Sequence, residues 1–192
     1  MVLFFLILAA IGPPDPASAA CSADRQKNAI KSLTVAADLA PGMLKRSNHA
    51  FSPFPRKRLE KVAKFEAGIR ECGPVPKIWD YADCSASDEV CLVPDIERYF
   101  AEFCLSSLDW IWFSDSKSQR RFIVRVAFTQ YLALEVFWRK NNFKETRELR
   151  KRFRALNSSV SINESAARKE IARIKSLFKK IEEAGDLRKK GK

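Results

Sequence analysis

Five cysteines are the residues of this chain whose type and spacing could do covalent chemistry. Four of them lie within 33 residues of one another: Cys72, Cys84, Cys91 and Cys104. Two chemistries suit such a cluster, a pair of disulfides or a zinc site. Because the spacings contain no C-x2-C pair and the single histidine, His49, is distant in sequence, the pattern favours disulfides and predicts no metal site.

Four cysteines allow three pairings, and we predict the nested one. In that arrangement Cys72 pairs with Cys104 around an inner Cys84–Cys91 bridge, so that the outer bond joins two antiparallel helices and the inner bond closes the loop between them. The fifth cysteine, Cys21, is then left unpaired, lipidated or paired with another chain.

The first twenty residues are typical of an export signal. An apolar run from Val2 to Ile11 is too short to cross a bilayer as a mature helix, and prolines end it. Ala17-Ser18-Ala19 follows, the small-residue pattern that signal peptidases cut, and Ser18-Ala19-Ala20 is nearly as good, so the mature chain should begin at Ala20 or Cys21. We therefore predict a signal peptide at 1–20 and a secreted or periplasmic mature protein, with a lipid anchor at Cys21 as an alternative.

Basic residues are concentrated in the last third of the chain. The whole sequence has a net charge of +12, and residues 139–192 contain 18 Lys and Arg against 7 Asp and Glu. We predict an anion-binding surface made by eight side chains of one segment: Arg139, Lys140, Lys144, Arg147, Arg150, Lys151, Arg152 and Arg154. The alternative is that these charges only solvate two long helices.

The chemistry of guanidinium groups indicates the kind of partner. Arginine-rich helices bind phosphate and carboxylate oxygens bidentately. For an exported protein this favours lipid phosphate, another envelope component or an acidic protein over nucleic acid. Membrane association through Cys21 lipidation or through the basic helices is a further prediction.

Catalytic and cofactor motifs are absent from the sequence. His49 lies in a polar segment without an acid or cysteine pattern beside it, and no nucleophile elbow, zinc-protease motif or phosphate-binding loop occurs. We therefore predict no cofactor and favour a non-enzymatic binding or interaction protein. A small secreted hydrolase is the alternative, because a pair of catalytic carboxylates is recognised only by its separation in space.

The elements that must position these residues read as helices. Apolar spacing and helix-ending residues predict five of them, at 22–39, 56–71, 94–114, 117–156 and 161–184. Pro41-Gly42 should end the first, Asn141-Asn142 should kink or divide the fourth, and Gly185 should close the last. Ser161 and Glu164 form a capping-box pattern at the start of the last helix.

Together these elements predict an all-α protein: a disulfide-stapled bundle of about five helices with a long basic C-terminal hairpin. The domains expected are a signal peptide at 1–20, a helical domain with the cysteine-bearing connection at 21–156, and a basic helix and tail at 157–192. The stretch 122–138 is apolar enough to raise a membrane span. Its charged residues, Arg125 and Glu135, make the central helix of a bundle the better interpretation.

Overall fold

The chain is mostly helical in the computed structural model, which confirms the all-α prediction. The structure describes residues 21–46, 53–114, 116–140 and 144–190; within these it has six α-helices and one short two-stranded sheet. The predicted signal peptide at 1–20 and His49 lie outside the described residues.

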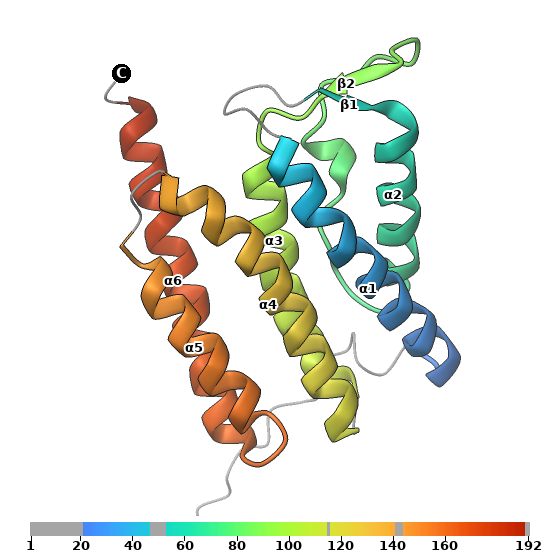
Figure 1. Cartoon of the computed structure of the whole chain (residues 1–192). Coiled ribbons are helices and arrows are strands. Elements are labelled where there is room, and N and C mark those ends of the chain that lie inside the picture. Colours follow the sequence, from blue (N-terminus) through green and yellow to red (C-terminus); the bar gives the residue numbers. More distant parts are fainter. Residues whose placement is uncertain (1–20, 47–52, 115, 141–143, 191–192) are drawn as a thin grey trace, which may run out of the picture.

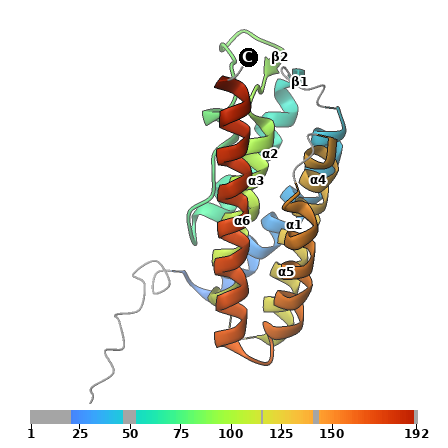
Figure 2. The same ribbon diagram turned by 90° about the vertical axis from the view of Figure 1, so that its left-hand side faces the viewer.

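The helices form three antiparallel hairpins placed side by side (Figure 1). The pairs are α1 (Ala23–Arg46) with α2 (Arg56–Arg70), α3 (Ile96–Asp109) with α4 (Lys117–Lys140), and α5 (Thr146–Ser159) with α6 (Glu164–Lys190). Seen from the side, one helix of each hairpin contributes to each of two layers (Figure 2). The first layer contains α1, α4 and α5, and the second contains α2, α3 and α6.

The position of α4 explains its apolar sequence. It lies in the middle of its layer and contacts α1, α3 and α5, so three of its sides are covered. Tyr131 and Trp138 are buried, and the Trp138 ring meets Phe178 of α6 edge-on at 5.1 Å between centroids. In the part of the chain that the structure describes, no helix has the length and apolar character needed to span a membrane.

The connection between α2 and α3 is tied down by a small sheet. β1 (Pro53–Pro55) pairs antiparallel with β2 (Val90–Leu92), which places Phe54 opposite Cys91. Two 3-10 turns flank α3, η2 (Ile78–Asp80) before it and η3 (Trp110–Phe113) after it. Strands of three residues are too short to show a recognisable alternation of apolar and polar residues in the sequence.

Several helix ends differ from the sequence prediction. α1 continues through Pro41-Gly42 to Arg46, and α6 continues through Gly185 to Lys190. Proline and glycine disfavour a helix interior locally, but the packing of α1 along α2 and α4 offsets that cost. The predicted helix at 117–156 is two helices, α4 and α5, so the total is six rather than five.

The start of α6 is capped by a different residue from the one predicted. The backbone N–H of Ala166 donates a 3.0 Å hydrogen bond to the side-chain oxygen of Asn163, which makes Asn163 the capping residue. Ser161 is buried in the turn before it and does not take this role. The capping-box prediction is therefore wrong by two residues.

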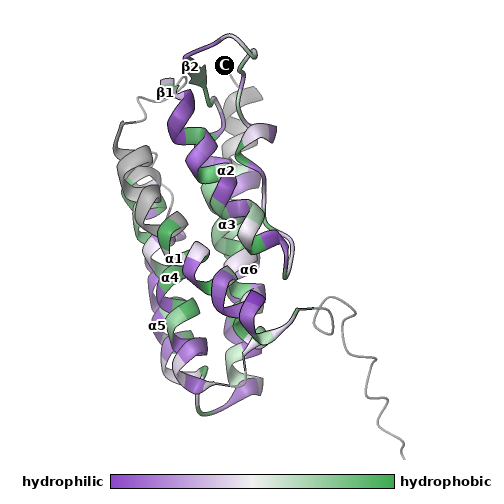
Figure 3. Ribbon diagram, turned by 90° about the vertical axis from the view of Figure 1, so that its right-hand side faces the viewer, coloured by the Kyte–Doolittle hydropathy of each residue, from purple (hydrophilic) through white to green (hydrophobic). Residues whose placement is uncertain are grey.

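Amphipathic packing holds α2 against the rest of the bundle. Figure 3 shows hydrophilic and hydrophobic residues in alternation along α2. Leu59, Val62 and Ile69 are buried, as the sequence predicts. Gly68 allows the close approach of α1, because a Cβ there would lie 2.8 Å from the Ser32 hydroxyl oxygen.

Glu66 departs from the amphipathic pattern because it is buried among the apolar residues of α2. Its Oε1 atom accepts a 2.6 Å hydrogen bond from the Tyr99 hydroxyl and a 2.8 Å bond from the Ile78 N–H. Arg70 Nη1 lies 3.6 Å from Oε2. Burial raises the pKa of Glu66, although its hydrogen bonds oppose the shift. One carboxyl group thus joins α2, α3 and the cysteine-bearing connection.

Candidate anion-binding surface

The basic segment around α5 is divided by the helix into an inner and an outer face. Its buried side chains are Thr146, Leu149, Phe153 and Leu156. Phe153 stacks on Tyr131 of α4 with ring centroids 5.0 Å apart, which fixes the rotation of α5. The side opposite this buried stripe therefore points to solvent.

Four of the eight predicted basic residues lie on that outer side: Lys144, Arg147, Lys151 and Arg154. All four are exposed. Arg147, Lys151 and Arg154 align along one face of α5, and Lys144 lies in the turn just before the helix. We call these four residues the α5 ridge. Among the described residues, the ion pair of the ridge is a loose one, with 3.9 Å between Lys151 Nζ and Glu148.

Arg150 has a structural partner instead. Its Nη2 atom lies 2.5 Å from Oε2 of Glu135, a carboxylate of α4 that is only 2% exposed. The hydrogen bond to Glu135, and then its negative charge, raise the pKa of Arg150. This ion pair joins α5 to α4 and neutralises a charge that would be costly to bury alone.

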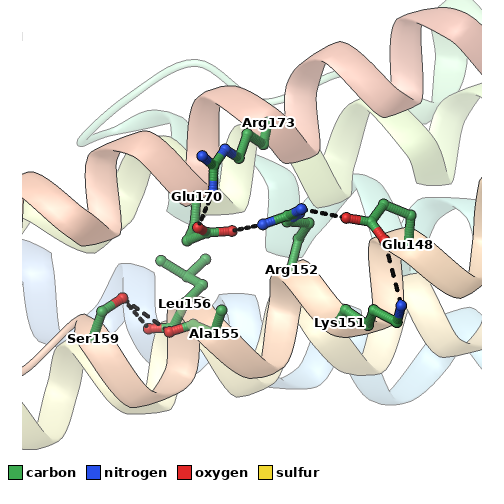
Figure 4. A network of polar contacts seen from close by, with 8 residues as sticks. All are labelled: Glu148, Lys151, Arg152, Ala155, Leu156, Ser159, Glu170 and Arg173. Atoms are coloured by element: carbon green, nitrogen blue, oxygen red, sulfur yellow. Dashed lines mark hydrogen bonds and ion pairs between the residues drawn. The ribbon is translucent and has the colours of Figure 1, made fainter.

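Arg152 is held in the same way on the other flank of α5. Figure 4 shows its guanidinium between Glu148 of the same helix and Glu170 of α6, with Nη1 3.5 Å from Glu170. Arg173 of α6 reaches the other oxygen of Glu170 at 2.7 Å. This network joins α5 to α6, while the nearby Ser159 hydroxyl donates to backbone carbonyls within α5.

The structure thus separates the predicted surface into two groups. Arg150 and Arg152 join α5 to its neighbours, and the α5 ridge remains open to solvent. The side chains of Arg139 and Lys140 lie outside those that the structure describes. A helical projection alone could have separated the outer positions from the flanks, but it could not have located Glu135 or Glu170.

The disulfides differ from the nested prediction. Cys21 pairs with Cys72, with Cα atoms 5.1 Å apart, and Cys84 pairs with Cys91 at 4.8 Å. Cys104 is free and buried, with its sulfur 3.2 Å from the Ala127 carbonyl oxygen of α4. Burial raises the pKa of the Cys104 thiol. The inner bridge agrees with the prediction, whereas the outer Cys72–Cys104 bridge is wrong.

Helix direction is the reason for this difference. α1 and α2 are antiparallel, so the residue before α1 and the residue after α2 meet at one end of the bundle. Cys104 lies within α3, and its sulfur contacts the Ala127 carbonyl oxygen of α4 instead of a cysteine. A Cys21 sulfur held in a disulfide is not available for lipidation, so the lipid-anchor alternative is also wrong for this structure.

A cluster that the sequence did not indicate surrounds Trp112. The guanidinium groups of Arg120 and Arg168 lie over its ring, 5.1 Å and 4.4 Å from the centroid. Arg168 also contacts Glu164 at 2.7 Å. The cluster joins η3, α4 and α6. Glu164 contacts both Arg120 and Arg168 and neutralises part of their charge, so we interpret the cluster as structural. An open depression on α6 lies beside it, lined by Glu164, Ser165, Arg168, Lys169 and Ala172.

The two groups of arginines differ in what their replacement should do. We expect Arg150→Glu to lower the melting temperature clearly more than Arg154→Glu, because it places a second carboxylate beside the buried Glu135. Arg154 is exposed on the ridge, where a charge change should be nearly neutral for folding. Thermal unfolding followed by circular dichroism checks both variants. Equal melting temperatures would contradict the structural role of Arg150.

No family model, curated protein or solved structure matches this chain. The fold and the surface therefore define the protein by themselves: a disulfide-bonded, all-helical bundle with an exposed basic ridge on α5.

Proposed function

We propose that the protein is an exported, non-enzymatic binding protein that engages an anionic partner through the α5 ridge. One observation carries the proposal. The ridge holds four exposed cations, three on the outer face of α5 and one in the turn before it, whereas the arginines on its flanks are matched with carboxylates of α4 and α6. If these cations served only to keep α5 soluble, there would be no need for some to be paired with carboxylates and others to be left open to solvent.

The spacing of the ridge suits contact with several anionic groups at once. With a helical rise of 1.5 Å per residue, Arg147 and Arg154 are separated by about 10 Å along the axis of α5, and Lys144 extends the ridge into the turn before the helix. Arg147 and Arg154 can each bind a phosphate or carboxylate through two parallel N–H donors, and the lysines add point charges. Lipid phosphate, another envelope component and an acidic protein all present such groups.

Two features support export. The apolar run and the Ala17-Ser18-Ala19 pattern suit signal cleavage. The two disulfides, Cys21–Cys72 and Cys84–Cys91, suit an oxidising compartment. The localisation that we propose is therefore secreted or periplasmic.

A variant with all four ridge residues replaced by glutamine tests the binding site. We expect its affinity for a short polyphosphate chain to fall by about tenfold or more, because each exposed cation contributes a few tenths of a kcal/mol to a contact. Glutamine keeps the helix propensity of lysine and arginine, so the fold should be retained. Fluorescence anisotropy at low and high salt measures the affinity, and high salt should weaken wild-type binding.

A matched control separates a site from net charge. Glutamine at Lys57, Lys61, Lys64 and Lys180 removes four exposed charges from α2 and α6, so both variants have the same net charge. The control should bind like the wild type. If the two variants lost the same affinity, the ridge would be no site and only overall charge would matter.

A further inference from the structure

The basic surface is wider than the α5 ridge. The two other helices of the same layer, α1 and α4, also carry exposed basic residues on the side opposite their own buried residues. These are Lys27 and Lys31 on α1, and Arg121 and Arg125 on α4. We call these four residues and the α5 ridge together the basic layer face. Among the described side chains of α1, α4 and α5, Asp24 is the one exposed acidic residue, while the Glu148 side chain, 36% exposed, is paired with Lys151 and Arg152.

The opposite layer, α2, α3 and α6, matches part of its charge with ion pairs, although Lys57, Lys61, Lys64 and Lys180 are also exposed there. On α3, Arg98 contacts Glu102 at 2.9 Å. Between α6 and α3, Lys175 contacts Asp109 at 2.6 Å. On α6, Lys179 lies 3.8 Å from Glu183. For the cations of the basic layer face on α1 and α4, the structure records no ion pair among the residues it describes. Among the described side chains, the two layers differ in their exposed acidic residues: Glu60, Asp109, Glu164, Glu182 and Glu183 on the opposite layer, and Asp24 on the layer of α1, α4 and α5.

The shape of this side distinguishes between anionic partners. α1, α4 and α5 lie beside one another in a single layer, as the views in Figures 1 and 2 agree. Packed helices are about 8–10 Å apart, so the cations spread over about 20 Å across the layer as well as along each helix. A linear polyanion following α5 would leave the cations of α1 and α4 unused. A flat anionic surface would contact all three helices together.

We infer that the basic layer face docks the protein on an anionic phospholipid surface, with α1, α4 and α5 lying against the headgroups. The inference rests on the proposed function and names its partner. Lipid phosphates are matched by guanidinium groups of Arg121, Arg125, Arg147 and Arg154. Each basic residue close to such a surface strengthens binding by about fivefold, equivalent to about 1 kcal/mol, and salt weakens the attraction.

Vesicle co-sedimentation of the disulfide-bonded protein tests the inference. The probes are vesicles of phosphatidylcholine alone and vesicles in which a third of the lipid is phosphatidylglycerol. Three glutamine variants with the same net charge are compared: the ridge variant, a variant at Lys27, Lys31, Arg121 and Arg125, and the control at Lys57, Lys61, Lys64 and Lys180. All twelve positions are exposed, so folding should be retained, and circular dichroism checks this.

We expect wild type and control to bind the anionic vesicles and not the neutral ones. Both variants of the basic layer face lose four basic residues and should bind roughly several hundredfold more weakly. If the α1/α4 variant bound like the wild type while the ridge variant did not, the flat-surface inference would be overturned and the proposed ridge would stand. Binding of polyphosphate without binding to anionic vesicles would have the same consequence. A ridge variant that bound both probes like the wild type would overturn the proposed function itself.

Discussion

Replacing Cys21 and Cys72 together by serine should lower the free energy of unfolding by about 4 kcal/mol. The bond joins residues 51 positions apart, and the chain-entropy model gives this magnitude for the loop it closes. The same model gives only about 2.5 kcal/mol for Cys84–Cys91, whose cysteines are 7 positions apart. Urea unfolding of the two double variants, followed by circular dichroism, measures the difference.

Peptide mapping without reduction provides the control for this prediction. It should yield one peptide pair joined through Cys21 and Cys72 and an alkylated Cys104 after unfolding. Cys104→Ser should leave both bridges intact. A Cys72–Cys104 peptide would contradict the structure and restore the nested arrangement.

Replacing Glu66 by leucine should lower the free energy of unfolding by about 3 kcal/mol. The Tyr99 hydroxyl and the Ile78 N–H would lose their common acceptor in a buried environment, and each unsatisfied donor costs about 1–3 kcal/mol. Glu66→Gln is the matched control, because its amide oxygen can still accept these bonds. Urea unfolding at one pH compares the two variants. An equal decrease in the free energy of unfolding in both would contradict the role of the Glu66 oxygen as the common acceptor.

The pH dependence of the same variants follows from the raised pKa of Glu66. Since the folded-state pKa lies above the ordinary value of 4.5, the native state favours the protonated carboxyl. Its contribution is fully present below pH 4.5 and is lost as the pH rises through the folded pKa. Wild type should therefore lose stability relative to Glu66→Gln as the pH rises above 4.5. A constant difference between them above that pH would contradict the buried, perturbed carboxyl.

Local pattern was sufficient to predict the fold class and most helices. The alternation that buries Leu59, Val62 and Ile69 is a property of neighbouring residues, so it predicts α2 without knowledge of its partners. The same reasoning places Leu149, Phe153 and Leu156 on the buried face of α5. It fails at Glu66, which has the spacing of a core residue and the chemistry of a surface one.

Helix ends were predicted less well, because local preference competes with packing there. Pro41, Gly42 and Gly185 are poor helix residues, yet α1 and α6 continue through them. The division of the predicted helix 117–156 was expected from local sequence, and α4 ends at Lys140 while α5 begins at Thr146.

The amino-acid sequence by itself determined that the protein is helical, that its cysteines form disulfides and that its last third is basic. Only the tertiary structure decided which cysteines pair and which cations are free. Cys21 and Cys72 meet because two helices run antiparallel, and Arg150 is neutralised because α4 brings a buried carboxylate to it. Both are contacts between segments distant in the chain, where spacing along the sequence carries no information about separation in space.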